Sequence, residues 1–175
     1  MTLAVSDIER WARQIILPEV GGRGQERLLG ATAAVVGEGE AARFAADLLS
    51  RAGLRSGDAA ASDVVVDLSS DRAGILARGR LARDARRPFV VALGAEVSTL
   101  VGRPCVECAP LAAEGTAPGA PLALALGALA AAEALRVLLA PPDSGRVQIL
   151  DARAGGLTAR ELAGPGCAAC EAAAP

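Results

Sequence analysis

Four cysteines, the only ones in the chain, form two C-x-x-C pairs, Cys105 with Cys108 and Cys167 with Cys170. A two-residue spacer lets both thiolates of one pair reach the same ion, and two pairs complete a tetrahedral four-sulfur shell. Zinc suits this ligand set because it imposes no geometry of its own and accepts sulfur donors. The pattern therefore predicts a structural zinc site that leaves no open position for a reacting water.

Two other uses of the same cysteines are a redox dithiol and a set of local disulfides. A redox pair typically occurs once, where a strand meets a helix, whereas the first pair here follows Gly102-Arg103-Pro104 and the second lies in a Gly-Pro-Gly tail. The first ten residues carry Asp7 and Glu9 where an export signal would be basic. We therefore expect a cytoplasmic, reducing location, which favours metal over disulfide.

A second candidate for chemistry is the glycine-rich turn after the apolar segment 31–36. Residues 37–42, Gly-Glu-Gly-Glu-Ala-Ala, match the G-x-G-x-x-[G/A] nucleotide-binding pattern. Gly37 would make the tight turn, and Gly39 would let the backbone approach a phosphate at a helix N-terminus. Glu38 and Glu40 would repel that phosphate. A strand–helix turn that binds nothing is the alternative.

Composition narrows the class of protein. The 175 residues are 52% apolar but only 2% aromatic, so we expect one domain whose core is built from Ala, Leu and Val. The near-balanced charge, net −2, argues against a nucleic-acid partner. Pro118, Gly119 and Pro121 interrupt the longest charge-free segment, which argues against a membrane partner.

Hydrophobic patterning and turn signals predict the elements that must position these residues. Ser6 and Glu9 form a capping box that starts the first helix, and Gly53 ends a later one. The predicted helices are 7–16, 25–29, 41–52, 71–86 and 122–139, and the predicted strands are 31–36, 63–68, 89–93, 98–101, 147–151 and 157–162.

Two charged groups on the predicted helices are assigned to solvent. The arginines of helix 71–86 are interleaved with acids and are expected to form a solvated face, namely Arg72, Arg78, Arg80, Arg83, Arg86 and Arg87. Glu133 and Arg136, at i and i+3, are expected near the exposed end of the apolar helix 122–139.

The order of these landmarks resembles the ThiF/MoeB/HesA family, the bacterial relatives of ubiquitin-activating enzymes. The resemblance covers nearly the whole chain and is carried by residues 9–15, 24–28, 35–39, 63–67, 103–108, 120–127, 133–135 and 145–151 together with the second cysteine pair. It implies an α/β fold with a shortened, Rossmann-like three-layer sheet, helices on both faces, a C-terminal hairpin and a four-cysteine zinc clasp.

The resemblance also implies a single ThiF/MoeB-like domain over residues 1–175. Its expected parts are an N-terminal helical arm (1–30), a shortened Rossmann-like core (31–104) and a region of zinc knuckles, buried helix and hairpin (105–175). Family members bind ATP and magnesium and adenylate the C-terminal glycine of a ubiquitin-like sulfur carrier. They act as dimers in which an N-terminal arginine reaches the partner's ATP, and the motif places that arginine at Arg13.

Departures from the family pattern fall on the nucleotide-handling residues. The segment between Gly53 and Asp63 lacks the ribose-binding Asp and the ATP-contacting lysine of the family. The family's Thr-Asp-Asn is replaced by Ser69-Ser70-Asp71, so the magnesium-binding position holds Ser70. The crossover-loop cysteine is missing, with Glu114 near its expected place. We therefore expect neither ATP nor magnesium to bind.

The sequence thus predicts a degenerate family member, a pseudoenzyme that does not adenylate and that serves as a binding or scaffold partner in sulfur-carrier activation. Its expected partners are a second copy or a complete family member, and a ubiquitin-like sulfur carrier. An active ATP-dependent adenylyltransferase is the alternative. No catalytic residue is predicted, and any residual nucleotide binding is assigned to Arg13, Gly37, Gly39 and Asp71.

Overall fold

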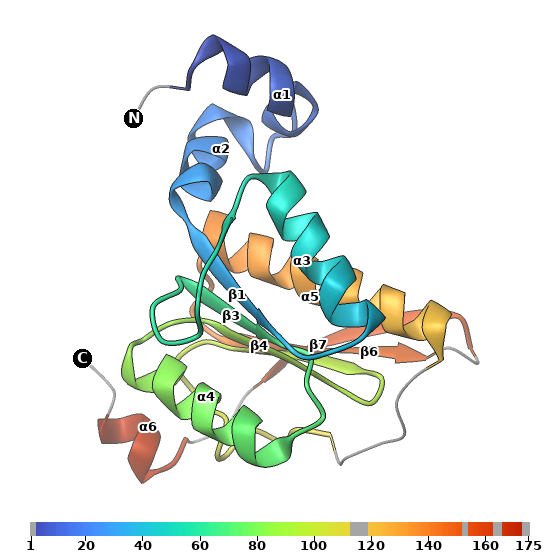
Figure 1. The fold of residues 1–175 in the computed structure, drawn as a ribbon. Coiled ribbons are helices and arrows are strands. Elements are labelled where there is room, and N and C mark those ends of the chain that lie inside the picture. The colour runs from blue at the N-terminus through green and yellow to red at the C-terminus, as the bar shows by residue number, and fades with distance from the viewer. Residues whose placement is uncertain (1–2, 113–118, 152–153, 163–165, 173–175) are drawn as a thin grey trace.

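A single seven-stranded sheet organises the chain in the computed structural model, which describes residues 3–112, 119–151, 154–162 and 166–172 (Figure 1). The strand order is β2-β1-β3-β4-β5-β6-β7. The four strands from β2 to β4 in this order are parallel, and the last three pair antiparallel. The strands are β1 Thr32–Val36, β2 Arg55–Ser56, β3 Val64–Asp67, β4 Phe89–Leu93, β5 Glu96–Leu100, β6 Gly145–Asp151 and β7 Gly156–Leu162.

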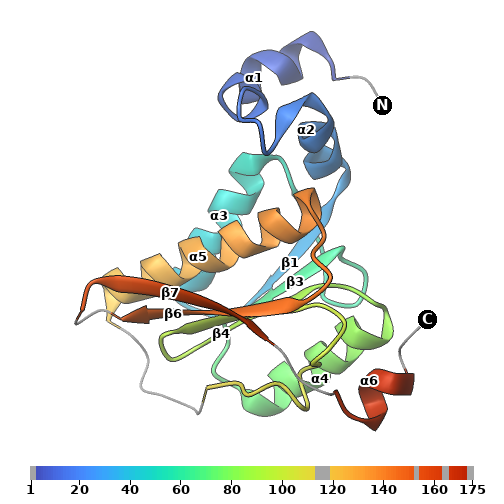
Figure 2. The same cartoon turned by 180° about the vertical axis from the view of Figure 1, so that it is seen from behind.

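Helices cover both faces of this sheet and make three layers. Helices α3 and α5 lie on one face, and α4 lies on the other with the short α6 beside it (Figures 1 and 2). The helices are α1 Val5–Ile15, α2 Gly21–Gly30, α3 Glu40–Ala52, α4 Arg72–Asp84, α5 Ala120–Leu139 and α6 Ala168–Ala172. The predicted α/β class, with a sheet between two helical layers, is confirmed.

Buried apolar residues form one cluster on each face of the sheet. All four residues of β3 are buried, as expected for a parallel strand with helices on both sides. Val64 and Val66 pack towards α3 and α5, whereas Val65 packs towards α4. Phe89 is the largest buried side chain, so small aliphatic residues fill most of the core.

Helix α5 is the central element of the first cluster. It is long and apolar enough, by length and composition, to cross a membrane. Here it packs beside α3 on the same face of the sheet, and its residues Ala130 and Ala134 are fully buried. At Gly127 an added Cβ would collide with the carbonyl oxygen of Ala41 on α3, so glycine permits the close approach of these two helices.

The N-terminal arm differs from its predicted boundaries. Helix α1 begins at Val5, so the predicted N-cap at Ser6 is wrong. The extended residue is Ala4, and its backbone N–H donates to the Asp7 carboxylate at 3.3 Å. Asp7 therefore fills the position that the sequence assigned to Glu9. Helix α2 extends over ten residues, beyond both predicted ends of its 25–29 segment.

Two further local features concern the segment that follows α3. Gly53 ends α3 with a left-handed backbone, φ 106°, which confirms its predicted role as a C-terminal glycine. Strand β2, which the sequence did not predict, is only two residues long and pairs in parallel with β1. The shortened segment between Gly53 and Asp63 therefore adds an edge strand to the sheet.

Candidate functional site

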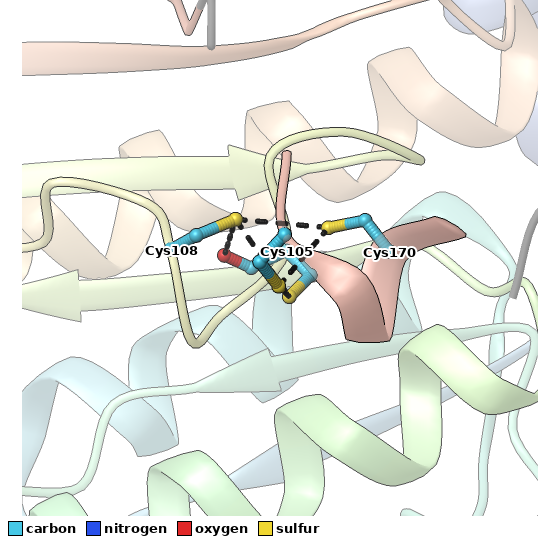
Figure 3. Close-up of side chains that lie close together, drawn as sticks. Cys105, Cys108 and Cys170 are labelled. Carbon is cyan, nitrogen blue, oxygen red and sulfur yellow. Dashed lines mark hydrogen bonds between the residues drawn. The ribbon is translucent and has the colours of Figure 1, made fainter. Parts of the chain in front are cut away.

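The two cysteine pairs are far apart in the sequence, and they meet on the side of the sheet that α4 covers. Cys105 and Cys108 lie in a turn after β5, where the backbone N–H of Cys108 donates to the carbonyl oxygen of Cys105 at 3.2 Å. Cys170 lies in α6, and Cys167 directly precedes this helix. Figure 3 shows the side chains of Cys105, Cys108 and Cys170 converging on one point. The structure thus brings all four predicted metal ligands together.

Sulfur-to-sulfur distances test whether a metal fits between the four cysteines. The distances are 4.0 Å for Cys105–Cys108, 3.9 Å for Cys105–Cys167, 3.6 Å for Cys108–Cys170 and 3.9 Å for Cys167–Cys170. A tetrahedral ion with metal–sulfur bonds of about 2.3 Å separates its ligands by roughly 3.8 Å. A disulfide needs a separation of about 2.05 Å. The arrangement fits a four-sulfur metal centre and contains no disulfide.

The two thiols of the first pair differ in acidity. Burial acts to raise the pKa of Cys105, but hydrogen bonds, the first from the backbone N–H of Glu107 and another from the Arg83 guanidinium, lower it to about 7. Burial raises the pKa of Cys108 to about 12, and its contacts with neighbouring thiols act in the same direction. A metal that binds here must displace the Cys108 proton, so its affinity rises with pH.

Helix α4 is fastened to the first cysteine pair by two arginines. Arg80 Nε donates to Glu107 Oε1 at 2.9 Å, and Arg83 Nη1 donates to Glu107 Oε2. The two guanidinium groups lower the pKa of Glu107. The predicted solvated position is therefore wrong for Arg83, whose side chain is 15% exposed, whereas Arg80 stays 52% exposed and also pairs with Glu107. The sequence offered no local signal for this contact, since 24 residues separate Arg83 from Glu107.

A cavity, here called the strand-end cavity, lies at the carboxyl ends of β1, β3 and β4. Its volume is about 850 Å³. Gly37, Gly39 and Asp71, three of the four residues predicted for residual nucleotide binding, line it together. Ligands of open α/β sheets bind at this edge. Glu114, near the expected crossover cysteine, lies outside the described residues.

Close backbone packing explains the first glycine of the turn. Gly37 has φ 128°, and a Cβ there would lie 2.7 Å from the carbonyl carbon of Leu68 and 2.9 Å from the Ser69 nitrogen. Gly39, with φ 90°, is the N-cap of α3, and a Cβ there would meet nothing within 4 Å. The backbone conformation favours glycine at both positions, close packing also requires it at Gly37, and Gly39 leaves the cavity side of the turn open.

Charge in the cavity is mostly negative. Asp67 is fully buried at the end of β3, and its Oδ2 accepts from Arg78 Nε at 2.6 Å. Ser69 Oγ also donates to Asp67, at 2.7 Å. Arg78 is the only basic residue among those that line the cavity, so the sequence-based expectation of a solvated Arg78 is wrong. Glu38, Glu40 and Asp71 remain exposed at the rim.

Arg13, the fourth predicted nucleotide-binding residue, does not line this cavity within its own chain. It is exposed on α1, which has no buried residue. That helix is held to the body by Trp11 Nε1 and Gln14 Nε2, which donate to the carbonyl oxygen of Arg51 at 3.0 and 3.4 Å. The predicted nucleotide contact of Arg13 is thus not made within this chain.

The sequence analysis gave the wrong surroundings for one carboxylate of α5. Glu133 is only 1% exposed, so its predicted position near an exposed helix end is wrong. It pairs with Arg136 at 2.9 Å, with Arg146 of β6, and with Thr99 Oγ1 at 2.7 Å. None of these four residues lines the strand-end cavity.

Comparisons with known proteins find the fold but no close relative. No family model matches the sequence, and no curated protein matches it. Among solved structures, MccB of E. coli in complex with succinimide superposes with a TM-score of 0.66 at 12% identity, over 92% of this chain and 74% of that one. PaaA gives a TM-score of 0.65 at 12% identity, over 91% of this chain and 84% of that one.

Two heterocyclases are also similar, and both are much longer. The heterocyclase TruD gives a TM-score of 0.62 at 18% identity, over 96% of this chain but 31% of its own length. A heterocyclase in complex with substrate and cofactor gives 0.63 at 12% identity, over 91% of this chain but 27% of its own. This chain therefore spans about a third or less of these two proteins. At such identities the likeness shows only that this chain shares the fold of these proteins.

Proposed function

We propose that this chain is a ThiF/MoeB/HesA-like protein that does not adenylate by itself and acts as a binding or scaffold partner in activating a ubiquitin-like sulfur carrier. The charge of the strand-end cavity carries this proposal. Its rim holds Glu38, Glu40 and Asp71, and the one guanidinium that lines it is occupied by Asp67. A triphosphate needs cations at these positions.

The size of the catalytic loss follows from the chemistry of phosphoryl and adenylyl transfer. These reactions rest on positioning and on neutralising the charge of phosphate oxygens. Each missing stabilising group costs about two to three powers of ten in rate. This chain contains no lysine and has Ser70 where the family places its magnesium-binding Asp. Losses at several positions together leave no useful rate.

The surface of the N-terminal arm supports the proposal that this chain binds a protein partner. Four large apolar side chains of the arm are exposed, namely Val5, Ile8, Ile16 and Leu17. Exposed apolar residues gathered on one segment are typical of interaction surfaces. We propose that a second copy or a complete family member covers them, and that Arg13 is then offered to the partner's nucleotide site. The four cysteines hold a structural zinc ion in this proposal.

The alternative function is adenylyl transfer with a rearranged site. The retained glycine turn and the cavity of about 850 Å³ favour it. Arg13, Gly39, Arg43 and Asp71 would then handle the nucleotide. This alternative and the scaffold proposal make opposite predictions for the isolated protein.

Exchange of radioactive pyrophosphate into ATP separates the two functions. With magnesium and a panel of purified sulfur carriers, the isolated protein is expected to stay at background, and exchange above background would establish the alternative. ATP titration gives a second measurement. The double change Glu38→Gln and Glu40→Gln is expected to tighten ATP binding, whereas Glu19→Gln, outside the cavity, is expected to leave it unchanged. Equal affinities in all three proteins would remove the electrostatic argument.

The scaffold role has its own test. Tagged protein expressed in its native cytosol is expected to retain a sulfur carrier or a complete family member, identified by mass spectrometry. Arg13→Ala is expected to keep the complex but lower the partner's adenylation rate. Recovery of neither kind of partner would count against the proposal.

A further inference from the structure

The first cysteine pair is in contact with α4 through both apolar and charged groups. Val106, between the two cysteines, packs against Gly79, where an added Cβ would lie 2.6 Å from the Val106 Cβ. One and four residues further along α4, Arg80 and Arg83 hold the Glu107 carboxylate. The cysteine turn is thus seated on one face of this helix at three places.

Arg83 differs from Arg80 in reaching a metal-ligating sulfur. Its Nη1 lies 3.9 Å from Cys105 Sγ, a hydrogen-bond distance for sulfur. Its side chain is 15% exposed, whereas that of Arg80 is 52% exposed. Among the described residues, no other guanidinium has a hydrogen bond to a cysteine sulfur. Arg83 is therefore placed between the Glu107 carboxylate and the sulfur cluster.

The positive charge of Arg83 lies where it can balance the charge of a metal bound by the four cysteines. A divalent ion with four thiolates carries two net negative charges. Cys105 and Cys170 are 2% and 3% exposed, so water solvates that charge poorly. A buried charge is stabilised when it is paired and hydrogen-bonded. Groups that hydrogen-bond to metal ligands orient those ligands and tune metal affinity.

We propose that Arg83 is a positioning residue of the metal centre, which orients the Cys105 thiolate and balances the charge of the four-sulfur cluster. Glu107 fixes the guanidinium for this purpose, because its two oxygens bind Arg83 and Arg80 on the same face of α4. The inference rests on the proposed metal centre and goes beyond its four ligands.

Competition with a chromophoric chelator measures the zinc affinity of the variants. Arg83→Gln is expected to weaken zinc binding by about 10- to 100-fold. Arg80→Gln removes a comparable ion pair to the same carboxylate but no sulfur contact, so its effect is expected to stay below about fivefold. Arg83→Lys keeps the charge without the planar fork and is expected to recover part of the affinity.

Cobalt substitution supplies a readout that a purely structural role would not move. The thiolate-to-cobalt charge-transfer band is expected to shift in Arg83→Gln and to be unchanged in Arg80→Gln. Thermal melting of the chelated proteins is expected to differ less between wild type and Arg83→Gln than melting of the zinc-loaded proteins.

Two outcomes would overturn the inference, and they are distinguishable. Wild-type protein that binds zinc, with Arg83→Gln within twofold of it or equal to Arg80→Gln, would reject the role of Arg83 and keep the metal centre. Wild-type protein that binds no zinc would reject both. Neither result bears on the pyrophosphate-exchange test.

Discussion

Asp67 and Glu133 are the fully buried carboxylates in the described part of the chain, and each lies against arginine. Arg78 pairs with Asp67, whereas Arg136 and Arg146 both pair with Glu133. The chain has no lysine, and the planar guanidinium suits such sites because it binds a carboxylate with two parallel hydrogen bonds. Both carboxylates are therefore ion-paired, and removal of either would leave buried or half-buried arginine without its counter-ion.

Glu133→Gln is expected to lower the free energy of unfolding by about 3 kcal/mol. This value is at the lower end for a broken buried pair, because Arg136 and Arg146 are 27% and 34% exposed and can be rehydrated. Urea unfolding at neutral pH measures it. The matched control is Glu161→Gln on β7, an exposed carboxylate, with an expected effect below about 0.5 kcal/mol. Equal effects of the two changes would contradict the prediction.

The same residue gives the protein a specific pH dependence. Burial acts to raise the pKa of Glu133, but hydrogen bonds from Arg146, Arg136 and Thr99 lower it below its ordinary value. A lowered folded-state pKa contributes stability that is present above the unfolded pKa of about 4.3 and is lost as pH falls through the folded value. The stability difference between wild type and Glu133→Gln is therefore expected to shrink below about pH 4.

At the scale of elements, α4 was predicted as a helix, but the acidic residues that face its arginines were not predicted. Its boundaries follow from the local sequence, and Asp71 lies at its N-cap. Its contacts with Glu107 and Asp67 come from residues on other elements, so helical spacing alone assigned its arginines to solvent. The same limit applies to Glu133, whose partner Arg146 lies on β6, 13 residues away. Local patterns find the charged residue but not the group that faces it.

Gly79→Ala tests the seating of the cysteine turn on α4. The added methyl group would meet Val106, and the overpacking is expected to cost about 1–3 kcal/mol despite the better helix propensity of alanine. Val106→Ala in the same chain is expected to recover part of that loss, which a double-mutant cycle measures. Gly22→Ala in α2, where the methyl group meets nothing within 4 Å, is the matched control and is expected not to destabilise. Additive effects would argue against the contact.

Strands and glycine positions were the most predictable elements of the fold. Buried apolar runs located β1, β3 and β4, and Gly53 marked the end of α3. Strand β2 was missed because two residues carry no periodic pattern. The segment around β2 is held by contacts between residues that are far apart in the sequence. Asp63 Oδ2 accepts hydrogen bonds from the backbone N–H and the hydroxyl of Thr32, both at 2.8 Å. The cysteine spacing predicted the sulfur cluster correctly, but nothing in it indicated the arginine beside the sulfurs.

At the scale of the whole molecule, α4 contacts both the strand-end cavity and the cysteine cluster, to which we assign different roles. At its middle Arg78 pairs with Asp67, next to the strand-end cavity, and near its C-terminal end Arg83 contacts the cysteine turn. The other helical layer, α3 with α5, belongs to the first apolar cluster, on the opposite face of the sheet. The cysteine cluster therefore contacts the α4 side of the molecule.

Zinc removal is expected to lower the local stability of only the α4 side of the molecule. Chelation is expected to speed amide hydrogen exchange in residues 105–111, in residues 166–172 and in α4, because metal binding energy is also folding energy for these segments. Exchange in α3 and α5 is expected to change little. Cys105→Ser is expected to reproduce the chelated pattern and to contain no zinc by elemental analysis, whereas Ala168→Ser, an exposed spacer of the second pair, is expected to behave as wild type. Uniform loosening of both layers would refute this division.

Strand β7 closes one side of the sheet, and its central residues 157–161 are all exposed. An edge strand presents unpaired backbone N–H and C=O groups, and strands of further chains can add to it side by side and build a fibre. Arg160 and Glu161 interrupt this strand with opposite charges, as gatekeepers do in natural sheet proteins. We therefore expect these two exposed charges to disfavour addition of a further chain to β7 at high protein concentration.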